Sequence, residues 1–149
     1  MPPKKFDLLG SLPKVVRDTS ARRESKEANR SVALEFGRDY FDGTREQGYG
    51  GYHYDGRWVA IAERAIEHWD LRPGDKVLDI GCAKGFFVKD LRDALPGLDV
   101  VGIDVSDYAL ANAHPNAKPF LRKASCDDLP FADGEFPVVF AINTIHNLE

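Results

Sequence analysis

The sequence predicts an α/β fold in which helices cover both faces of a parallel β-sheet. Short apolar runs that suit buried strands alternate with helical stretches through residues 57–149. A glycine-rich turn at residues 81–85 connects the first of these runs to a helix. Strand–helix–strand units of this length cross over in a right-handed sense, which makes their strands parallel.

The composition is that of one globular domain, with 149 residues of which 43% are hydrophobic. The longest apolar stretches, such as residues 137–142, are far shorter than the ~18 residues that span a bilayer. Residues 1–5 lead into no apolar signal segment. We therefore expect a cytoplasmic protein without a membrane segment. Cys82 and Cys126 are too few and too far apart to hold a metal ion, so we expect two free thiols and no metal.

Charge is distributed unevenly along the chain. The net charge is −4, but residues 1–30 contain eight Lys or Arg and four Asp or Glu, which leaves −8 on the remainder. An acidic body lacks the coherent basic surface that nucleic acid requires, so nucleic acid is not expected as the main partner. The basic arm is expected to be a solvated leader, with RNA binding as the lesser alternative.

Residues 1–56 are expected to precede a core at residues 57–149. Three prolines within residues 1–20 predict an arm, and a charged helix is predicted at residues 25–38. Residues 40–56 are dense in glycine and tyrosine, which predicts a mobile loop. Four of its rings either cover a bound ligand or anchor the loop: Tyr49, Tyr52, His53 and Tyr54.

Helices and strands then alternate. Six apolar residues recur at helical spacing and predict a helix packed on a core: Trp58, Ile61, Ala62, Ala65, Ile66 and Trp69. Another helix follows Gly85, and Ser106 is predicted to cap a short third one. Strands are predicted at residues 76–80, 98–103, 120–124 and 138–142. Pro137 cannot donate a ladder hydrogen bond, so the last strand should begin after it.

In a sheet of this kind the ligand lies beyond the carboxyl ends of the strands. Four segments with chemically suggestive side chains follow the four predicted strands and should converge there: residues 79–85, 104–108, 125–128 and 143–146. Each has a plain structural interpretation when taken singly, such as a helix cap at Ser106 or a solvated carboxylate at Asp104. Their joint placement favours a binding site.

The glycine turn by itself indicates a nucleotide-like or anionic ligand, because it admits a ligand to the backbone and presents free N–H groups. Asp79, just before the turn, would repel a pyrophosphate but attract an ammonium or sulfonium group. Small residues stand at the first, third and fifth positions of the turn, whereas the dinucleotide fingerprint needs the first, third and sixth. Asp104, 23 positions after Gly81, can accept both hydroxyls of a ribose. An adenosine-containing cation therefore fits better than NAD.

These motifs resemble those of class I S-adenosylmethionine (SAM)-dependent methyltransferases, of the methyltransferase domain 11 and 25 type. Residues 79–85 look like their glycine-rich motif I, residues 102–106 like their second-strand acidic motif, and residues 129–136 like the stretch that leads into strand four. The resemblance covers residues 58–149. It implies a Rossmann-like sheet with the strand order 3-2-1-4, the first half of that fold, and a chain that is truncated after strand four.

The resemblance also implies SAM as the cofactor and assigns roles to matching positions. Asp79 and the turn backbone would hold the methionine end, and Asp104 the ribose. His146 resembles a position near the acceptor and is the candidate catalytic residue, although packing at a helix start explains it equally well. The full set of expected cofactor-binding residues is Tyr52, Asp79, Gly81, Cys82, Ala83, Gly85, Asp104, Val105, Ser125, Cys126, Asp127 and Asn143.

Three positions depart from the family pattern. Ala83 replaces the usual central glycine of the turn. Ser125 stands where an Asp commonly contacts the adenine amino group, so that contact is either weaker or made by Asp127. Pro137 replaces the usual Asp at the start of strand four.

The expected function is methyl transfer from SAM to a small-molecule or sugar-like acceptor. Such a reaction needs alignment and exclusion of water more than a general base, which suits a sequence without an evident catalytic triad. The alternative is a catalytically inactive SAM-binding or interaction module. Strand four would be an exposed sheet edge, so we expect either a truncated chain or a homodimer that covers this edge.

Overall fold

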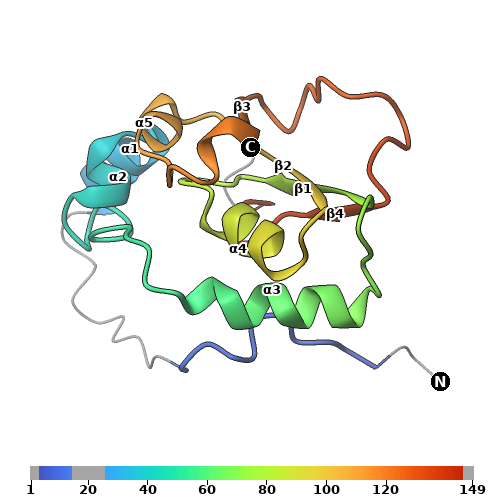
Figure 1. Ribbon diagram of the computed structural model, residues 1–149. Coiled ribbons are helices and arrows are strands. Elements are labelled where there is room, and N and C mark those ends of the chain that lie inside the picture. The colour runs from blue at the N-terminus through green and yellow to red at the C-terminus, as the bar shows by residue number, and fades with distance from the viewer. Residues whose placement is uncertain (1–3, 15–25, 146–149) are drawn as a thin grey trace.

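A computed structural model describes residues 4–14 and 26–145 (Figure 1). A four-stranded parallel sheet forms its centre, with the helices beside it and beyond one end. The helical elements are α1 (Lys26–Leu34), α2 (Arg38–Asp42), α3 (Arg57–His68), α4 (Phe86–Ala94), α5 (Asp107–Ala111) and a short 3-10 helix, η2 (Lys118–Phe120). The strands are β1 (Lys76–Ile80), β2 (Asp99–Asp104), β3 (Leu121–Lys123) and β4 (Val138–Phe140).

The strand order is β3-β2-β1-β4 and all neighbours are parallel, which confirms the predicted Rossmann-like topology. β1 lies between β2 and β4, with Val77 opposite Val100 on one side and Val138 on the other. Because all strands run in one direction, their carboxyl ends meet at one edge of the sheet. The helices α1, α2 and α5 gather beyond that edge (Figure 1).

The main core lies between the sheet and the helices α3 and α4. The predicted helical stripe is confirmed in part: Ile61, Ala62 and Ala65 of α3 are fully buried, whereas Trp69 lies just after α3 and is 41% exposed. Phe87 of α4 connects the layers, since its ring contacts Trp58 of α3 and Phe140 of β4 at centroid distances of 5.3 and 5.2 Å. The order of the sheet therefore depends on apolar contacts among three elements far apart in sequence.

Several element boundaries differ from those predicted. The helix expected over residues 25–38 is interrupted, because α1 ends at Leu34 and Phe36 adopts a left-handed backbone with φ of 46° before α2 begins. The third and fourth strands are three residues long, shorter than predicted. β4 begins directly after Pro137, as its missing N–H group requires. Ser106 caps α5 by accepting a hydrogen bond from the Ala109 N–H, which confirms that prediction.

The first described segment, residues 4–14, lies against α3 (Figure 1). The Phe6 ring stacks on His68 at 3.7 Å, and the Arg64 guanidinium donates to backbone carbonyls of the same segment.

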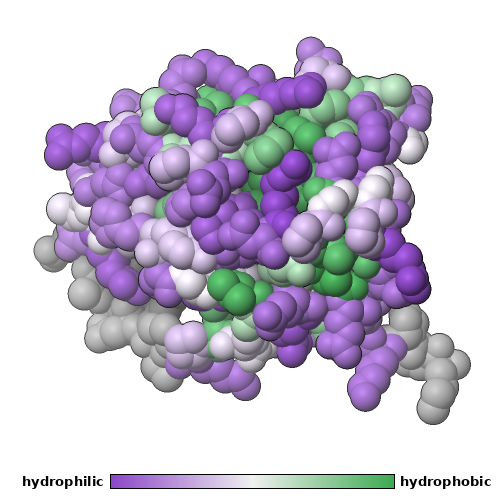
Figure 2. All heavy atoms as spheres, in the orientation of Figure 1, coloured by the Kyte–Doolittle hydropathy of each residue, from purple (hydrophilic) through white to green (hydrophobic). Residues whose placement is uncertain are grey.

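Hydrophilic side chains dominate the face in Figure 2, with smaller apolar areas between them. Among residues 4–14 and 26–145, no helix is both long and apolar enough to cross a membrane.

Replacing Phe87 with Ala should lower the free energy of unfolding by about 3–5 kcal/mol, because the ring is 3% exposed and its removal leaves a cavity among three elements. Urea denaturation measures this. Val139→Ala is the matched control, since Val139 is 49% exposed and should cost under about 1 kcal/mol. Equal losses for the two variants would contradict the proposed role of Phe87.

Candidate functional site

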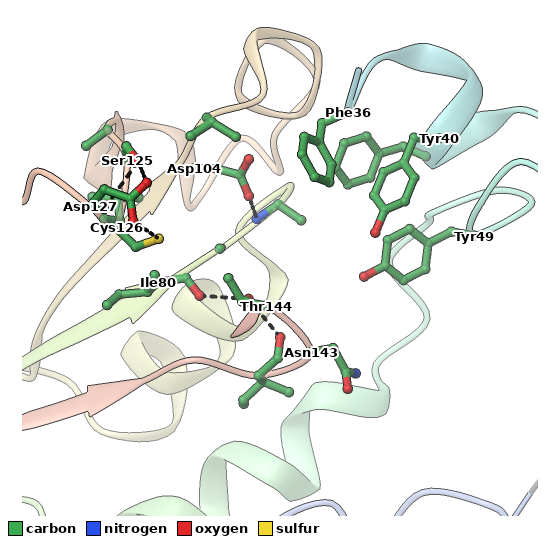
Figure 3. A pocket seen from close by; sticks show the side chains of 17 residues that line it. Phe36, Tyr40, Tyr49, Ile80, Asp104, Ser125, Cys126, Asp127, Asn143 and Thr144 are labelled. Atoms are coloured by element: carbon green, nitrogen blue, oxygen red, sulfur yellow. Dashed lines mark hydrogen bonds between the residues drawn. The ribbon is translucent and has the colours of Figure 1, made fainter. Parts of the chain in front are cut away.

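A cavity of about 340 Å³ opens at the carboxyl ends of the strands (Figure 3). One side is formed by the ends of β1, β2, β3 and β4 and the turns that follow them, and the other by aromatic residues of the N-terminal segment. The lining residues are Phe36, Tyr40, Phe41, Tyr49, Ile80, Gly81, Ala83, Ile103, Asp104, Val105, Ala124, Ser125, Cys126, Asp127, Ile142, Asn143 and Thr144. The four segments predicted to converge do so as far as the described residues extend.

The turn at residues 81–85 is tied to the end of β2 by its own backbone. The N–H groups of Gly81 and Cys82 both donate to the Ile103 carbonyl, at 2.8 and 2.9 Å. The Ala83 N–H donates to the Asp104 carboxylate at 2.8 Å. These three amides are therefore already paired within the protein and are not free to bind a ligand.

Close packing explains why the turn begins with glycine. A Cβ atom on Gly81 would lie 2.2 Å from Thr144 Oγ1, and the φ angle of Gly81 is 75°. Thr144 itself donates from Oγ1 to the Ile80 carbonyl at 3.1 Å. The chain after β4 thus packs directly against the turn after β1, and a side chain at position 81 would push the two apart.

Asp104 joins the turn to α5 as well. Its two carboxylate oxygens accept from the Ala83 and Ser106 N–H groups, both at 2.8 Å. Burial raises the pKa of Asp104, and these backbone hydrogen bonds oppose the rise. A carboxylate can accept about four hydrogen bonds, so Asp104 keeps acceptor capacity for a ligand hydroxyl besides these backbone donors.

Asp79 lies in β1, just before the turn, and does not line the cavity. It is 4% exposed, and no group in the described part of the chain donates a hydrogen bond to its carboxylate. Burial, with the nearby charge of Asp104, raises the pKa of Asp79 to about 8. A buried carboxyl group without a donor is costly to ionise, which makes this position receptive to a cation.

The aromatic side of the cavity was only partly predicted. Phe36, Tyr40 and Tyr49 face the strand ends across the cavity (Figure 3). Tyr49 lies in the predicted glycine- and tyrosine-rich loop, whereas Phe36 and Tyr40 were not assigned to the site. Tyr52 lies behind this wall, stacked on Phe86 at 4.9 Å. The density of aromatic residues over 36–54 was the one available signal.

The predicted cofactor residues fall into two groups. Eight line the cavity: Gly81, Ala83, Asp104, Val105, Ser125, Cys126, Asp127 and Asn143. Four others do not line the cavity: Tyr52, Asp79, Cys82 and Gly85. The candidate catalytic residue, His146, lies outside the described residues. Within the described ranges, no group of three or more His, Cys, Asp or Glu could hold a metal ion.

Comparison with known proteins identifies relatives for this part of the chain. Residues 77–149 match a family model described as a methyltransferase domain. A malonyl-[acyl-carrier protein] O-methyltransferase of Legionella pneumophila is 37% identical over 76 residues, which are 48% of this chain and 26% of that protein. An uncharacterized methyltransferase of Synechocystis is 36% identical over 84 residues, which are 56% of this chain and 39% of that protein.

Two further matches are more distant. A sterol 24-C-methyltransferase of Schizosaccharomyces pombe is 30% identical over 106 residues, with coverage of 62% of this chain and 28% of that protein. The crystal structure of MccD protein matches with a TM-score of 0.46 and 26% identity, over 56% of this chain and 38% of that one. The chain thus spans between about a quarter and two fifths of the curated relatives compared here.

Gly81→Ala should lower the free energy of unfolding by more than about 2 kcal/mol, through backbone strain at positive φ and collision with Thr144. In a Thr144→Ala background the same change should cost less, because part of the collision is gone. Chemical denaturation of the two single variants and the double variant measures the coupling. Strictly additive losses would show that the two residues are not in contact.

Asp79→Asn should alter the pH dependence of stability. Folding raises the pKa of Asp79. The protonated carboxyl group therefore contributes stability that is fully present below the pKa of the unfolded state, near 4, and is lost as the pH rises through about 8. The free energy of unfolding of the native protein should therefore fall relative to Asp79→Asn by up to about 1.4 kcal/mol per pH unit across this window. Urea denaturation at pH 5, 6.5 and 8 tests this, with exposed Asp99→Asn as the control. Parallel profiles for native protein and Asp79→Asn would disprove it.

Proposed function

We propose that this chain, whose residues 77–149 match a methyltransferase domain, is a class I SAM-dependent methyltransferase that binds SAM in the cavity at the strand ends and takes part in methyl transfer to a small-molecule or sugar-like acceptor. One observation carries the proposal: Asp104 lies on the cavity wall, and a second carboxyl group, Asp79, is buried just before the same glycine turn. A ligand that carries both a ribose and a positive charge uses both carboxylates.

The residues present fit such a ligand. The cavity volume of about 340 Å³ lies within the range of small-molecule pockets, about 300–1,000 Å³. Asp104 retains lone pairs for the ribose hydroxyls, and Val105, Cys126 and Asp127 would border the adenine. Asp79 would stabilise the cationic methionine end in its ionised form, which a nearby positive charge favours by lowering the raised pKa of this carboxyl group.

When bound, SAM would supply a methyl group on a positively charged sulfur; the sulfur would keep the electron pair of the broken carbon–sulfur bond, and the acceptor would release a proton. The chain's own residues would align the two groups and exclude water from them. The aromatic side of the cavity serves the second task. The Tyr49 hydroxyl is uncharged at neutral pH, and burial raises its pKa further above the usual value.

A small acceptor is supported by charge and by the relatives. The net charge of −4 argues against a polyanionic acceptor. The acceptors named for the relatives, a malonyl group on its carrier protein and a sterol, differ in chemistry. Since the chain covers only part of each relative, the residues that choose the acceptor are expected to lie largely outside the matched segment.

Titration calorimetry with SAM tests the cofactor site. Asp104→Asn keeps the shape of the side chain but loses its charge and one acceptor oxygen, so it should weaken SAM binding by about tenfold or more. Asp99→Asn, at the opposite end of β2, is the control and should bind as the native protein does. Absence of SAM binding by the native protein would overturn the proposal. Binding without transfer of labelled methyl to any small-molecule fraction would favour the inactive binding module instead.

A further inference from the structure

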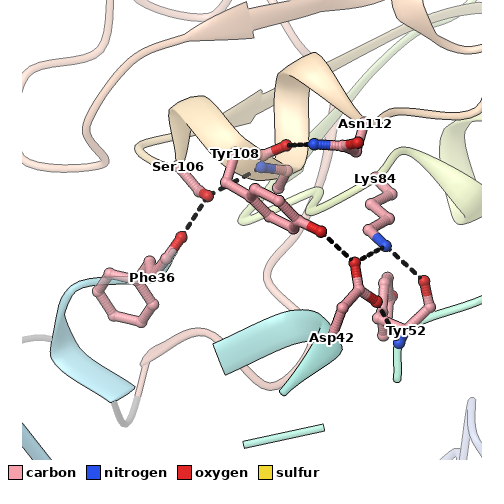
Figure 4. A network of polar contacts seen from close by, with 8 residues as sticks. Phe36, Asp42, Tyr52, Lys84, Ser106, Tyr108 and Asn112 are labelled. Atoms are coloured by element: carbon pink, nitrogen blue, oxygen red, sulfur yellow. Dashed lines mark hydrogen bonds and ion pairs between the residues drawn. The ribbon is translucent and has the colours of Figure 1, made fainter. Parts of the chain in front are cut away.

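Lys84 is the charged residue of the glycine turn, and its side chain is buried. Only 7% of the side chain is exposed, and Nζ lies against Asp42 and Tyr52 of the N-terminal segment (Figure 4). It donates to Asp42 Oδ2 at 2.7 Å and to the Tyr52 carbonyl at 2.8 Å. The turn that forms one side of the cavity is therefore bonded to the segment that forms the other.

Asp42 is the centre of this network (Figure 4). Besides Lys84, it accepts from the Tyr108 hydroxyl at 2.5 Å and from the Tyr52 N–H at 3.0 Å. Burial tends to raise the pKa of Asp42, but the hydrogen bonds from Lys84, Tyr108 and Tyr52 lower it to about 2. The carboxylate thus stays charged and paired at physiological pH. A further anchor comes from Ser106, whose hydroxyl donates to the Phe36 carbonyl.

These bonds hold the aromatic wall in place. The residues that line the cavity from the N-terminal segment are Phe36, Tyr40, Phe41 and Tyr49, and they lie at or between the anchored positions 36, 42 and 52. Their rings pack on one another, for example Tyr40 on Tyr49 at 5.3 Å. Ring contacts alone allow sliding, whereas directed hydrogen bonds at three positions define where the wall stands.

The chemistry of the pair favours positioning over bulk stability. A buried ion pair adds little net stability compared with apolar residues of similar volume, because both charges lose their hydration. The ion pair instead fixes the orientation of the two segments, because Lys84 Nζ donates to one carboxylate oxygen and one backbone carbonyl at the same time. A ligand that enters a wall already in place does not have to order those side chains on binding.

We propose that Lys84 and Asp42 are positioning residues that hold residues 36–52 as a preformed wall of the SAM site. They act through the aromatic rings and do not themselves touch the cofactor. This inference rests on the proposed function, because it takes SAM as the occupant of the cavity. It adds to that function a segment that lies outside the matched residues 77–149.

The test compares Lys84→Met with two matched variants. Asp42→Asn combined with Lys84→Met removes both charges and so leaves no unpaired ion in a buried place. Lys76→Met removes an exposed lysine paired with Glu135 at the opposite end of β1. Two properties are measured on each protein: the affinity for SAM by calorimetry, and amide hydrogen exchange of residues 36–52 without ligand, with α3 as the internal reference.

Lys84→Met should weaken SAM binding by about tenfold or more and speed exchange in residues 36–52 by about tenfold or more, with α3 unchanged. The double variant should resemble Lys84→Met in both properties, since the same contact is lost, and Lys76→Met should resemble the native protein. Should Lys84→Met fail to fold, the double variant and Tyr108→Phe, which removes one donor to Asp42, give the same readouts.

Unchanged exchange in residues 36–52 would overturn the inference, because the pair would then not hold the wall. Faster exchange with native SAM affinity would also overturn it, because the wall would then not belong to the site. Failure of the native protein to bind SAM is a different outcome. It would reject the proposed function, and with it the inference, even if the exchange data showed that the pair holds the segment.

Discussion

The structure depends on the attachment of the glycine turn after β1 to the carboxyl end of β2. Two turn amides share the Ile103 carbonyl and a third binds the Asp104 carboxylate. To make these bonds the backbone takes left-handed angles at Gly81, Ala83 and Gly85. The turn therefore cannot move independently of β2, and the cavity between them has a defined shape before any ligand enters. Thr144, seated on Gly81, extends the same constraint to the end of β4.

This constraint places two carboxyl groups where they are poorly solvated. Asp104 is compensated by backbone donors, whereas Asp79 has none among the described residues and its pKa rises to about 8. An arrangement chosen only for stability would avoid an unpaired buried carboxyl group. Its presence beside a ligand cavity is the kind of local conflict that marks functional sites. Stability and the proposed binding of a cation thus make opposite demands on Asp79.

The N-terminal segment completes the cavity from a distance. Phe36 to Tyr52 precede the sheet in sequence, yet the Lys84–Asp42 ion pair and the Tyr108 hydroxyl connect them to the turn and to α5. The ion pair reaches across 42 positions of the chain. The candidate site is therefore built from two regions. One is formed by the strand ends and the glycine turn, which carry a recognisable motif, and the other is the aromatic wall, whose position depends on polar contacts.

The sequence by itself determined the strands, the helices α3 and α4, the cap at Ser106 and the start of β4 after Pro137, because these follow from local periodicity and from the donor that proline lacks. The glycine spacing and the acidic residues 79 and 104 were enough to predict the floor of the cavity. Only the tertiary structure decided that the turn amides are paired, that Asp79 is buried, and that Phe36 and Tyr40 form a wall held through Lys84. Periodicity reports which face of an element is buried, but contacts between residues 42 positions apart depend on how the intervening chain closes and packs.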